Sequence, residues 1–209
     1  MKILITAGGT REYIDPVRFI SNASSGRMGY ALARAALNAG HEVVLITAPV
    51  SLPKPAGAEL IQVETSAQMF IAVKNHFPDC DCLIMAAAVS DYKPVKQSPS
   101  KIKKTNADLT IDLKPTQDIL SWAGRRKSKN QLVAGFALED KNLKDNAEKK
   151  LKTKKLDMIV ANSPSAIAAE NSTVHIKTAI GDWITFAESS KTATAKKIIK
   201  MIESLNKSL

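Results

Sequence analysis

Cysteine is scarce in this sequence: among its 209 residues, only Cys80 and Cys82 carry a thiol. Their spacing of one intervening residue matches no common zinc pattern, a second ligand pair is missing, and the three histidines are scattered. These residues therefore indicate neither a metal site nor a redox pair. We expect Cys82 to begin a buried strand and Cys80 to lie in the loop before it.

Long apolar runs are missing too, and aromatic residues make up only 5% of the chain. The longest apolar runs, such as Leu83–Val89, are far too short to span a bilayer, so no membrane association is expected. No apolar stretch of signal-peptide length follows the strand-like run Lys2–Thr6, and we therefore expect a cytoplasmic protein. The low aromatic content also disfavours stacking platforms for single-stranded nucleic acid.

Acidic residues are fewer than basic ones, and the formal net charge is +10. The basic residues concentrate in Lys101–Lys104, Arg125–Lys129 and Lys141–Lys155. Such an excess suits nucleic acid, an anionic surface or small anionic substrates. A nucleotide with several phosphates also needs cationic partners, so the charge alone does not choose among these ligands.

The chain does contain a regular alternation of short apolar runs and helix-like segments. Its 44% of hydrophobic residues suits one sizeable core, and continuous apolar strands predict a parallel sheet that helices cover on both faces. A Gly181-Asp182 turn between Val174–Lys177 and Trp183–Phe186 indicates a small antiparallel hairpin. We expect a single α/β domain over residues 1–209, Rossmann-like and doubly wound, with a mainly parallel sheet and this C-terminal antiparallel hairpin.

The predicted elements follow from these runs and from their capping residues. Strands are expected at Lys2–Thr6, His41–Thr47, Leu60–Val63, Cys82–Ala87, Gln131–Phe136 and Met158–Ala161, and Leu109–Leu113 alternates polar and apolar residues. Helices are expected at Met28–Ala39, Ser66–Phe77, Thr116–Arg126, Leu143–Lys155 and Thr192–Leu205. Gly40 suits the end of the first helix and Ser66 the start of the second. Ser24 or Ser25 can cap the first helix and leave N–H groups free for an anion.

Ligands of open parallel sheets bind beyond the carboxyl ends of the strands, so the loops there carry the functional signal. After the first strand, Gly8 and Gly9 permit close backbone approach to a ligand. The segment Asn22–Gly29 then combines glycines with small hydroxyl residues. The glycine spacing does not match a dinucleotide fingerprint. We interpret this region as a phosphate-binding loop in preference to a long capped connection.

Two later strands end in similar segments. The small residues Ala86–Ala88 leave room for a flat ring or a ribose, and Asp91 could accept from a ribose hydroxyl, help hold a cation or be an exposed turn residue. Phe136 could pack on a base or fill the core. Lys150 and Lys154 lie one helical turn apart and share a face.

The lysine run Lys101–Lys104 follows a loop rich in proline, serine and lysine. A cationic loop near a phosphate site can act as a lid that delivers charge to a substrate. Lysine runs are more often solvated surfaces, and the spacing by itself favours that interpretation.

Together these segments resemble the phosphopantothenoylcysteine synthetase family, which in bacteria is often fused to a flavin-dependent decarboxylase. The resemblance runs in order from the first residues to about Asn162, and its Ser-Asn-x-Ser-Ser-Gly segment is highly specific. It is carried by Ile5–Glu12, Asp15–Gly29, Ala86–Tyr92, Lys101–Lys104, Gly135–Glu139 and the pattern Ala147, Lys150 and Lys154. No decarboxylase half precedes Met1, so we expect the stand-alone form or an excised domain.

The resemblance implies a ligase of coenzyme A biosynthesis that joins 4'-phosphopantothenate and L-cysteine. The carboxylate first attacks the α-phosphate of a nucleoside triphosphate, usually CTP, with assistance from Mg²⁺. Pyrophosphate leaves, and an acyl-nucleotide (acyl-cytidylate) forms. The cysteine amine then attacks the activated carbonyl and releases the nucleoside monophosphate. The family also implies a homodimer, with the tail hairpin and neighbouring strands as candidate contacts.

The same resemblance assigns residues to roles. It implies that Asn22 and Lys101 are catalytic, Asn22 by holding the phosphopantothenate and the acyl-nucleotide and Lys101 by assisting the first step. Substrate binding is expected to involve Asn22, Ser24, Ser25, Gly26 and Lys101. The nucleotide is expected to contact Gly8, Gly9, Ala86, Ala87, Ala88, Asp91, Phe136, Lys150 and Lys154. No metal ligands are assigned.

The sequence departs from the family pattern at a few positions. Gly9 stands where many relatives have proline, Gln117 stands where proline is common, and Leu138 and Asp140 replace smaller or hydroxyl residues. The last three bear on base recognition, where we expect CTP in preference to ATP.

Two other functions are alternatives to the ligase. A Rossmann-type oxidoreductase that uses NAD or NADP is disfavoured by the missing dinucleotide fingerprint and the missing Tyr-x-x-x-Lys pair. A nucleic-acid-binding module would leave Asn22–Gly29 unexplained, so no nucleic-acid partner is expected.

Overall fold

An eight-stranded mixed sheet forms the centre of the structure, a computed structural model that describes residues 1–166, 169 and 171–207. The strand order is β12-β11-β10-β9-β6-β1-β4-β5. The parallel part comprises β1 (Lys2–Ala7), β4 (Glu42–Thr47), β5 (Glu59–Gln62), β6 (Cys82–Met85), β9 (Leu132–Leu138) and β10 (Met158–Asn162). The chain moves outward from β1 through β4 to β5 and then returns to β6, so the switch point lies between β1 and β6.

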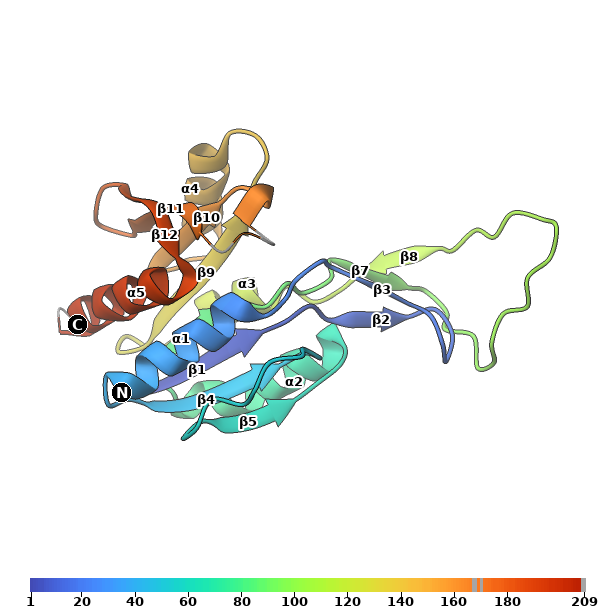
Figure 1. Cartoon of the computed structure of the whole chain (residues 1–209), viewed down its shortest axis with the longest axis horizontal. Helices are drawn as coiled ribbons and strands as arrows, with labels where there is room; N and C mark the ends of the chain where they lie inside the picture. The colour runs from blue at the N-terminus through green and yellow to red at the C-terminus, as the bar shows by residue number, and fades with distance from the viewer. Residues whose placement is uncertain (167–168, 170, 208–209) are drawn as a thin grey trace.

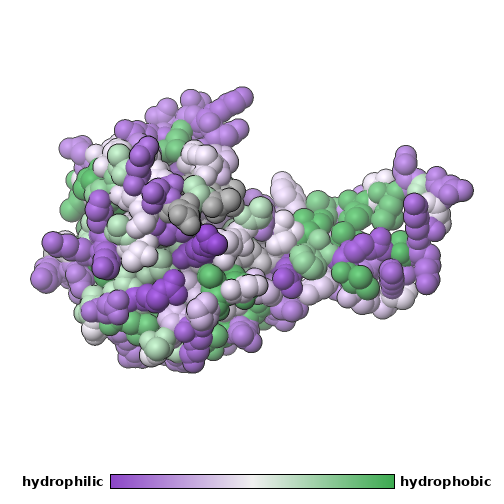
Figure 2. Space-filling view, viewed as in Figure 1, coloured by the Kyte–Doolittle hydropathy of each residue, from purple (hydrophilic) through white to green (hydrophobic). Residues whose placement is uncertain are grey.

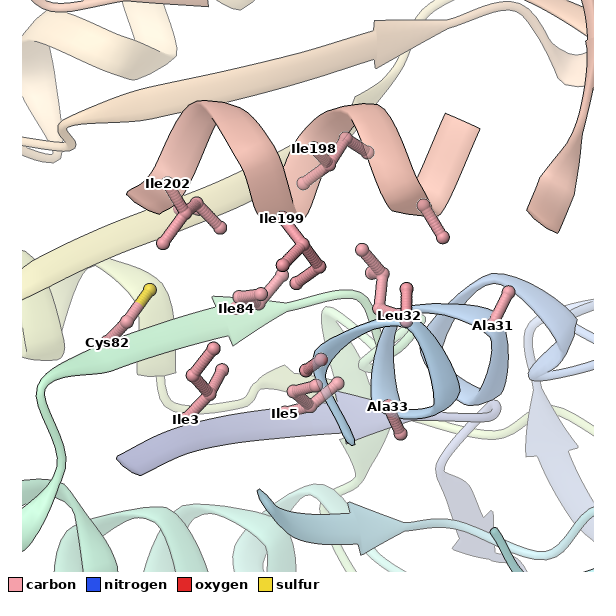
Figure 3. Close-up of a cluster of buried hydrophobic side chains, with 14 of the residues drawn as sticks. Ile3, Ile5, Ala31, Leu32, Ala33, Cys82, Ile84, Ile198, Ile199 and Ile202 are labelled. Atoms are coloured by element: carbon pink, nitrogen blue, oxygen red, sulfur yellow. The ribbon is translucent and has the colours of Figure 1, made fainter. Parts of the chain in front are cut away.

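Helices cover both faces of this sheet, which confirms the predicted doubly wound architecture (Figure 1). On one face, α1 (Arg27–Asn38) and α5 (Lys191–Asn206) enclose a core in which Ile5 of β1, Leu32 and Ile199 are fully or almost fully buried (Figure 3). On the other face lie α2 (Ser66–His76), α3 (Ile119–Arg126) and α4 (Leu143–Thr153), together with the short 3-10 helix η1 (Phe77–Asp79).

The central strands are apolar along their whole length because each face needs its own core. In β1, Ile3 and Ile5 belong to the core under α1 and α5, whereas Leu4 belongs to the core on the opposite face. Cys82 begins the buried strand β6, and Cys80 lies just before it, as predicted. Burial raises the pKa of the Cys80 thiol to about 12, so this thiol stays protonated near neutral pH.

The predicted C-terminal hairpin is present and extends the main sheet. After the 3-10 helix η2 (Pro164–Ala166), β11 (Asn171–Thr178) pairs antiparallel with β10, and β12 (Ile184–Ser190) pairs antiparallel with β11. Both strands are longer than the sequence pattern indicated. Because β12 leads directly into α5, the hairpin returns the chain to the face of the sheet that α1 covers.

The structure corrects two helix caps. The side chain that caps α2 belongs to Thr65, not to Ser66, and it forms a capping box with Gln68. At α1 neither Ser24 nor Ser25 caps the helix by its side chain. Gly26 occupies the N-cap position with φ 72°, a left-handed conformation that glycine adopts without steric cost.

Two short hairpins that the sequence analysis missed form a projection, which we call the arm (residues 11–21 and 92–115). The first pairs β2 (Arg11–Tyr13) with β3 (Phe19–Ser21), and the second pairs β7 (Tyr92–Pro94) with β8 (Leu113–Pro115). The loop 95–112 extends from the second hairpin, far from the sheet (Figure 1). Only Leu113 of the alternating segment Leu109–Leu113 lies in a strand. Among the described residues, no helix has the length and apolar character needed to cross a membrane.

Candidate functional site

A cavity of about 650 Å³ lies at the carboxyl ends of the parallel strands, next to the switch point between β1 and β6. The segment before α1, the end of β6, the start of α3 and the end of β9 converge there, and residues of β10, β11, α5 and the α4 region complete the lining. Many side chains that the sequence singled out line this one cavity. They are Asn22, Ser24, Ser25, Gly26, Ala86, Ala87, Ala88, Asp91, Phe136, Lys150 and Lys154.

Asn22 fastens the loop before α1 to the end of β6. Its Nδ2 donates to the carbonyl oxygens of Ala88 (3.3 Å) and Val89 (3.2 Å). Gly9 makes this contact possible, because a Cβ at Gly9 would lie only 2.7 Å from the carbonyl oxygen of Asn22. The close approach that we predicted for Gly9 is therefore made, within the protein, by the backbone of the Asn22 loop.

The segment from Ala86 to Ser90 is held in place by threonine hydroxyls. Thr6 Oγ1 accepts from the Ala87 amide (3.1 Å), and Thr10 Oγ1 accepts from the Ser90 amide (2.9 Å). Thr116 Oγ1 donates to the Ser90 carbonyl (2.6 Å). The three alanines thus present small side chains on a fixed backbone, which leaves space in the cavity. The following Asp91 is exposed at its edge.

Two lysines of the α4 region occupy one side of the cavity. Lys150 Nζ donates to the carbonyl oxygen of Phe136 (2.8 Å), and Lys154 Nζ forms an ion pair with Asp118 (2.8 Å). Burial lowers the pKa of Lys150, and the neighbouring positive charge of Lys154 lowers it further. For Asp118, burial acts to raise the pKa, but the Lys154 hydrogen bond and the Ser121 amide outweigh it, and the net shift is downward.

Of the two alternatives for Phe136, the structure shows packing against the core, and contact with a base stays a prediction. Its half-buried side chain packs against the core under α1 and α5 and also lines the cavity. The ring could therefore contact a base without leaving the core.

Two further cations line the cavity and were missed in the sequence analysis. Arg27 begins α1, and Lys191 begins α5 and donates to the carbonyl oxygen of Ala169. Burial lowers the pKa of Lys191, and Arg27 adds to the shift. The basic character of Arg27 was visible beside the phosphate-loop motif. No local signal could connect Lys191 to the site, because the hairpin β11–β12 is what carries α5 back to the cavity.

Three residues with predicted site roles do not line the cavity. Gly8 has φ 80°, and a Cβ there would lie 2.9 Å from the Ala48 carbonyl oxygen, so Gly8 packs against neighbouring backbone. Gly9 packs against Asn22 in the same way. Lys101 is exposed in the loop 95–112 of the arm, outside the residues that surround the cavity. The roles assigned to these three residues stay predictions.

Metal binding by the protein alone has little support in the described part of the chain. No group of three or more histidine, cysteine, aspartate or glutamate side chains there could hold a metal ion. Mg²⁺, however, commonly binds through one or two carboxylates together with substrate phosphates. Asp91 at the edge of the cavity fits that mode, whereas the Asp118 carboxylate already pairs with Lys154.

The doubly wound sheet defines the general class: a Rossmann-like α/β protein with a cavity at the carboxyl ends of its strands, the place where open α/β sheets commonly bind ligands. The chain belongs to the family described as the DNA/pantothenate metabolism flavoprotein C-terminal domain, whose model matches residues 1–205. This match confirms the family resemblance that the sequence predicted.

Individual relatives agree with this membership. The chain is 50% identical over 163 residues to a cysteine/cysteine sulfinic acid decarboxylase of an unknown prokaryotic organism, covering 78% of this chain and 45% of the relative. It is 48% identical over 168 residues to the coenzyme A biosynthesis bifunctional protein CoaBC of Bacillus subtilis, covering 80% and 41%. The chain thus spans less than half the length of these two relatives.

A solved structure extends the likeness to the whole fold. The crystal structure of the C-terminal domain of a coenzyme A biosynthesis bifunctional protein CoaBC is 38% identical, with a TM-score of 0.87. The match covers 100% of this chain and 96% of that one. The Rossmann-like architecture predicted from the sequence is confirmed by this comparison.

Proposed function

We propose that this chain is a phosphopantothenoylcysteine synthetase, a ligase that joins 4'-phosphopantothenate to L-cysteine through an acyl-cytidylate. The observation that carries this proposal is the cavity, which brings the Asn22 loop, the alanine segment and the two lysines Lys150 and Lys154 together. The relatives named as coenzyme A biosynthesis proteins support the pathway. CTP is the proposed nucleotide, and ATP is the alternative.

The first half-reaction needs stabilisation of negative charge. A carboxylate oxygen of phosphopantothenate forms a bond to the α-phosphorus, the bond from that phosphorus to the pyrophosphate oxygen breaks, and pyrophosphate carries away the electron pair. Lys150 and Lys154 are fixed by Phe136 and Asp118, so they offer charge without reorganisation. Asp91 would share in holding Mg²⁺, which supplies further charge neutralisation when bound with the nucleotide.

The second half-reaction needs the intermediate to be held while an amine approaches. The cysteine nitrogen forms a bond to the activated carbonyl carbon, loses a proton, and displaces the nucleoside monophosphate. Asn22 lies at the junction of the two loops that line the cavity, where its amide can orient polar groups of the intermediate without acting as a nucleophile.

The phosphate group of phosphopantothenate has its own candidate partners. Ser24, Ser25 and Gly26 precede α1, whose first N–H groups have no side-chain cap. Arg27 and Lys191 add positive charge on the same boundary of the cavity. An uncapped helix N-terminus with nearby cations suits a phosphate monoester.

The arm supports a homodimer as the active form. Ten large apolar side chains are strongly exposed among the described residues, and six of them lie in the arm: Val17, Phe19, Tyr92, Val95, Leu109 and Leu113. Apolar side chains gather along the projection in Figure 2. A second copy would cover them. We propose that the arm, more than the tail hairpin, forms this contact and places Lys101 at the cavity of the partner.

The test measures both half-reactions in quenched samples by mass spectrometry, without and then with cysteine. The wild type should release pyrophosphate only with phosphopantothenate and a triphosphate, with CTP preferred. Asn22→Asp should accumulate acyl-nucleotide, whereas Lys101→Gln should fail earlier and accumulate none. Each should lose roughly two to three orders of magnitude in its step. Lys103→Gln, in the same lysine run, is the matched control and should behave as the wild type.

Several results would contradict the proposal. Reduction of a nicotinamide cofactor, or the absence of any acyl-nucleotide in the wild type, would refute the ligase assignment. Better turnover with ATP would overturn only the choice of base. Accumulation of the intermediate by Lys101→Gln would show that the two residue roles are wrong.

A further inference from the structure

The turn between β2 and β3 contains a fully buried carboxylate, that of Asp15. One of its oxygens, Oδ1, accepts from the backbone amides of Val17 (2.8 Å) and Arg18 (2.9 Å), which closes the turn. The other oxygen, Oδ2, accepts from the Arg18 guanidinium through both Nε (3.0 Å) and Nη2. The two oxygens therefore have separate partners: Oδ1 binds the backbone of the turn, and Oδ2 binds the guanidinium.

The same ion pair holds a segment more than eighty residues away along the chain. The backbone amide of Ile102 donates to Asp15 Oδ2 (3.1 Å), and Arg18 Nη2 donates to the backbone carbonyl of Ile102 (2.8 Å). Both backbone polar groups of one residue are thus bound by one pair of opposite charges. We call this arrangement the Asp15–Arg18 clasp.

The clasp carries much of the anchoring of the loop 95–112. Two other backbone hydrogen bonds hold this loop: the Ser98 amide donates to the Ile14 carbonyl (2.9 Å), and the Val95 amide donates to the Asp112 carbonyl (2.9 Å), which joins the two ends of the loop. The clasp is the contact next to the lysine run, because Ile102 directly follows Lys101.

We infer that Asp15 and Arg18 are positioning residues that act through the backbone of Ile102 to place the Lys101 ammonium for the first half-reaction. This inference rests on the role proposed above for Lys101. A lysine side chain is long and flexible, so an exposed loop without a fixed backbone point would spread its charge over many positions. Fixing the adjacent residue restricts that spread, and misplacement by about 1 Å can cost roughly a hundredfold in rate.

The chemistry of the clasp agrees with this function. The Arg18 hydrogen bonds hold the pKa of Asp15 well below its usual range, against the effect of burial, and the amides of Val17, Arg18 and Ile102 act in the same direction. Asp15 thus stays ionised at any pH at which the enzyme would work. Asp15 therefore keeps its negative charge in the clasp while charged substrates bind and dissociate.

The first experiment measures the loop itself, without substrates. Amide hydrogen exchange by mass spectrometry, on peptides that cover residues 95–112, should be faster in Arg18→Gln and Asp15→Asn than in the wild type. Asn at position 15 keeps an oxygen for the turn amides but presents N–H groups to Ile102 and Arg18. Arg11→Gln, on the same hairpin with its guanidinium over the Phe19 ring, is the control and should not change exchange there.

The second experiment tests whether the clasp acts through Lys101. Arg18→Gln should lower the rate of acyl-nucleotide formation by about ten- to a hundredfold through kcat, with little change in KM for the triphosphate. The double variant Arg18→Gln/Lys101→Gln should be no slower than Lys101→Gln alone, because the group that Arg18 positions is absent from both. Arg18→Lys, which keeps the charge but not the forked geometry, should recover part of the rate.

The outcomes separate this inference from the proposed function. Unchanged exchange in both clasp variants, or losses that multiply in the double variant, would overturn the inference while leaving the ligase intact. If the wild type forms no acyl-nucleotide, the ligase proposal fails, and with it the positioning role. Faster exchange in the variants would then still establish the clasp as the anchor of the loop.

Discussion

The sheet body and the arm are built by different physical means. In the body, strands such as β1 and β6 are buried on both faces, and the cavity at their ends has its backbone fixed by threonine hydroxyls and ion pairs. In the arm, each strand is three residues long, and large apolar side chains face outward. The arm is thus held by polar contacts at a few points, above all by the Asp15–Arg18 clasp.

This difference shows how the two regions can divide the proposed catalytic work. Side chains on the body are preorganised, which suits groups that bind a nucleotide in one geometry. On the arm, the clasp fixes the backbone beside Lys101 while its side chain is long, flexible and exposed, which suits a charge that must reach a substrate bound elsewhere. We therefore expect changes in the body and in the arm to have distinguishable effects, as follows.

The largest expected effect tests whether the arm serves its own body or that of a partner. Lys101→Gln and Lys150→Gln should each lose about two to three orders of magnitude in pyrophosphate release. When the two variants are mixed, the rate should recover to at most about a quarter of the wild-type rate. About half of the dimers formed at random are mixed, and one of the two sites in each mixed dimer has both lysines.

Native mass spectrometry should confirm that mixed dimers form in that experiment. Mixed dimers without any recovery of the rate would show that each arm serves the cavity of its own chain. The body and the arm that form one site would then belong to the same chain.

A smaller effect is expected on assembly. Leu109→Ser and Val95→Ser should each raise the dimer dissociation constant by about ten- to a hundredfold, since burial of one large apolar side chain contributes about 1.5–3 kcal/mol. Light scattering over a range of concentrations measures this change. Ile180→Ser is the matched control: its side chain is 89% exposed, but it lies on the hairpin β11–β12. If Ile180→Ser dissociates the dimer and the arm variants do not, the tail hairpin is the interface.

The smallest expected effect concerns the pH dependence of the body. Because burial and Lys154 lower the pKa of Lys150 below 10.5, Lys150 should lose its positive charge at a lower pH than an ordinary lysine. As pH rises through that lowered value, affinity for the triphosphate should fall by up to about tenfold. Calorimetric titration with the triphosphate measures this affinity. Lys150→Arg keeps its charge and should abolish this decline, whereas an identical decline in that variant would assign the titration to another group.

The sequence pattern predicted the body well because the body is encoded by local periodicity. Continuous apolar runs identified the parallel strands, and Gly40 marked the end of the first helix within one residue. The predicted details that were wrong, such as a helix cap, depend on contacts between particular atoms. Ser66 was a reasonable cap, but Thr65 is the residue whose hydroxyl reaches the Gln68 amide.

The candidate site was predictable to the extent that its residues follow strands. Ala86–Ala88 lie just beyond the end of β6 and Phe136 lies near the end of β9, and the carboxyl ends of parallel strands meet at one edge of a sheet. Lys150 and Lys154 were predicted to lie on one face of a helix because they are one helical turn apart. The arm escaped prediction because three-residue strands show almost no alternation, and exposed apolar side chains resemble ordinary loop residues.

The sequence by itself thus determined the fold class, the family and many of the side chains around the cavity, because burial pattern and motif order are local properties of a chain. Only the tertiary structure decided three further points: that Lys191 reaches the cavity, that Lys101 lies away from it, and that Asp15 and Arg18 hold Ile102. The physical reason is the same in each case. These relations join residues far apart in the chain, and in the clasp they involve backbone N–H and C=O groups, which every residue type but proline carries and which therefore leave no signature in the sequence.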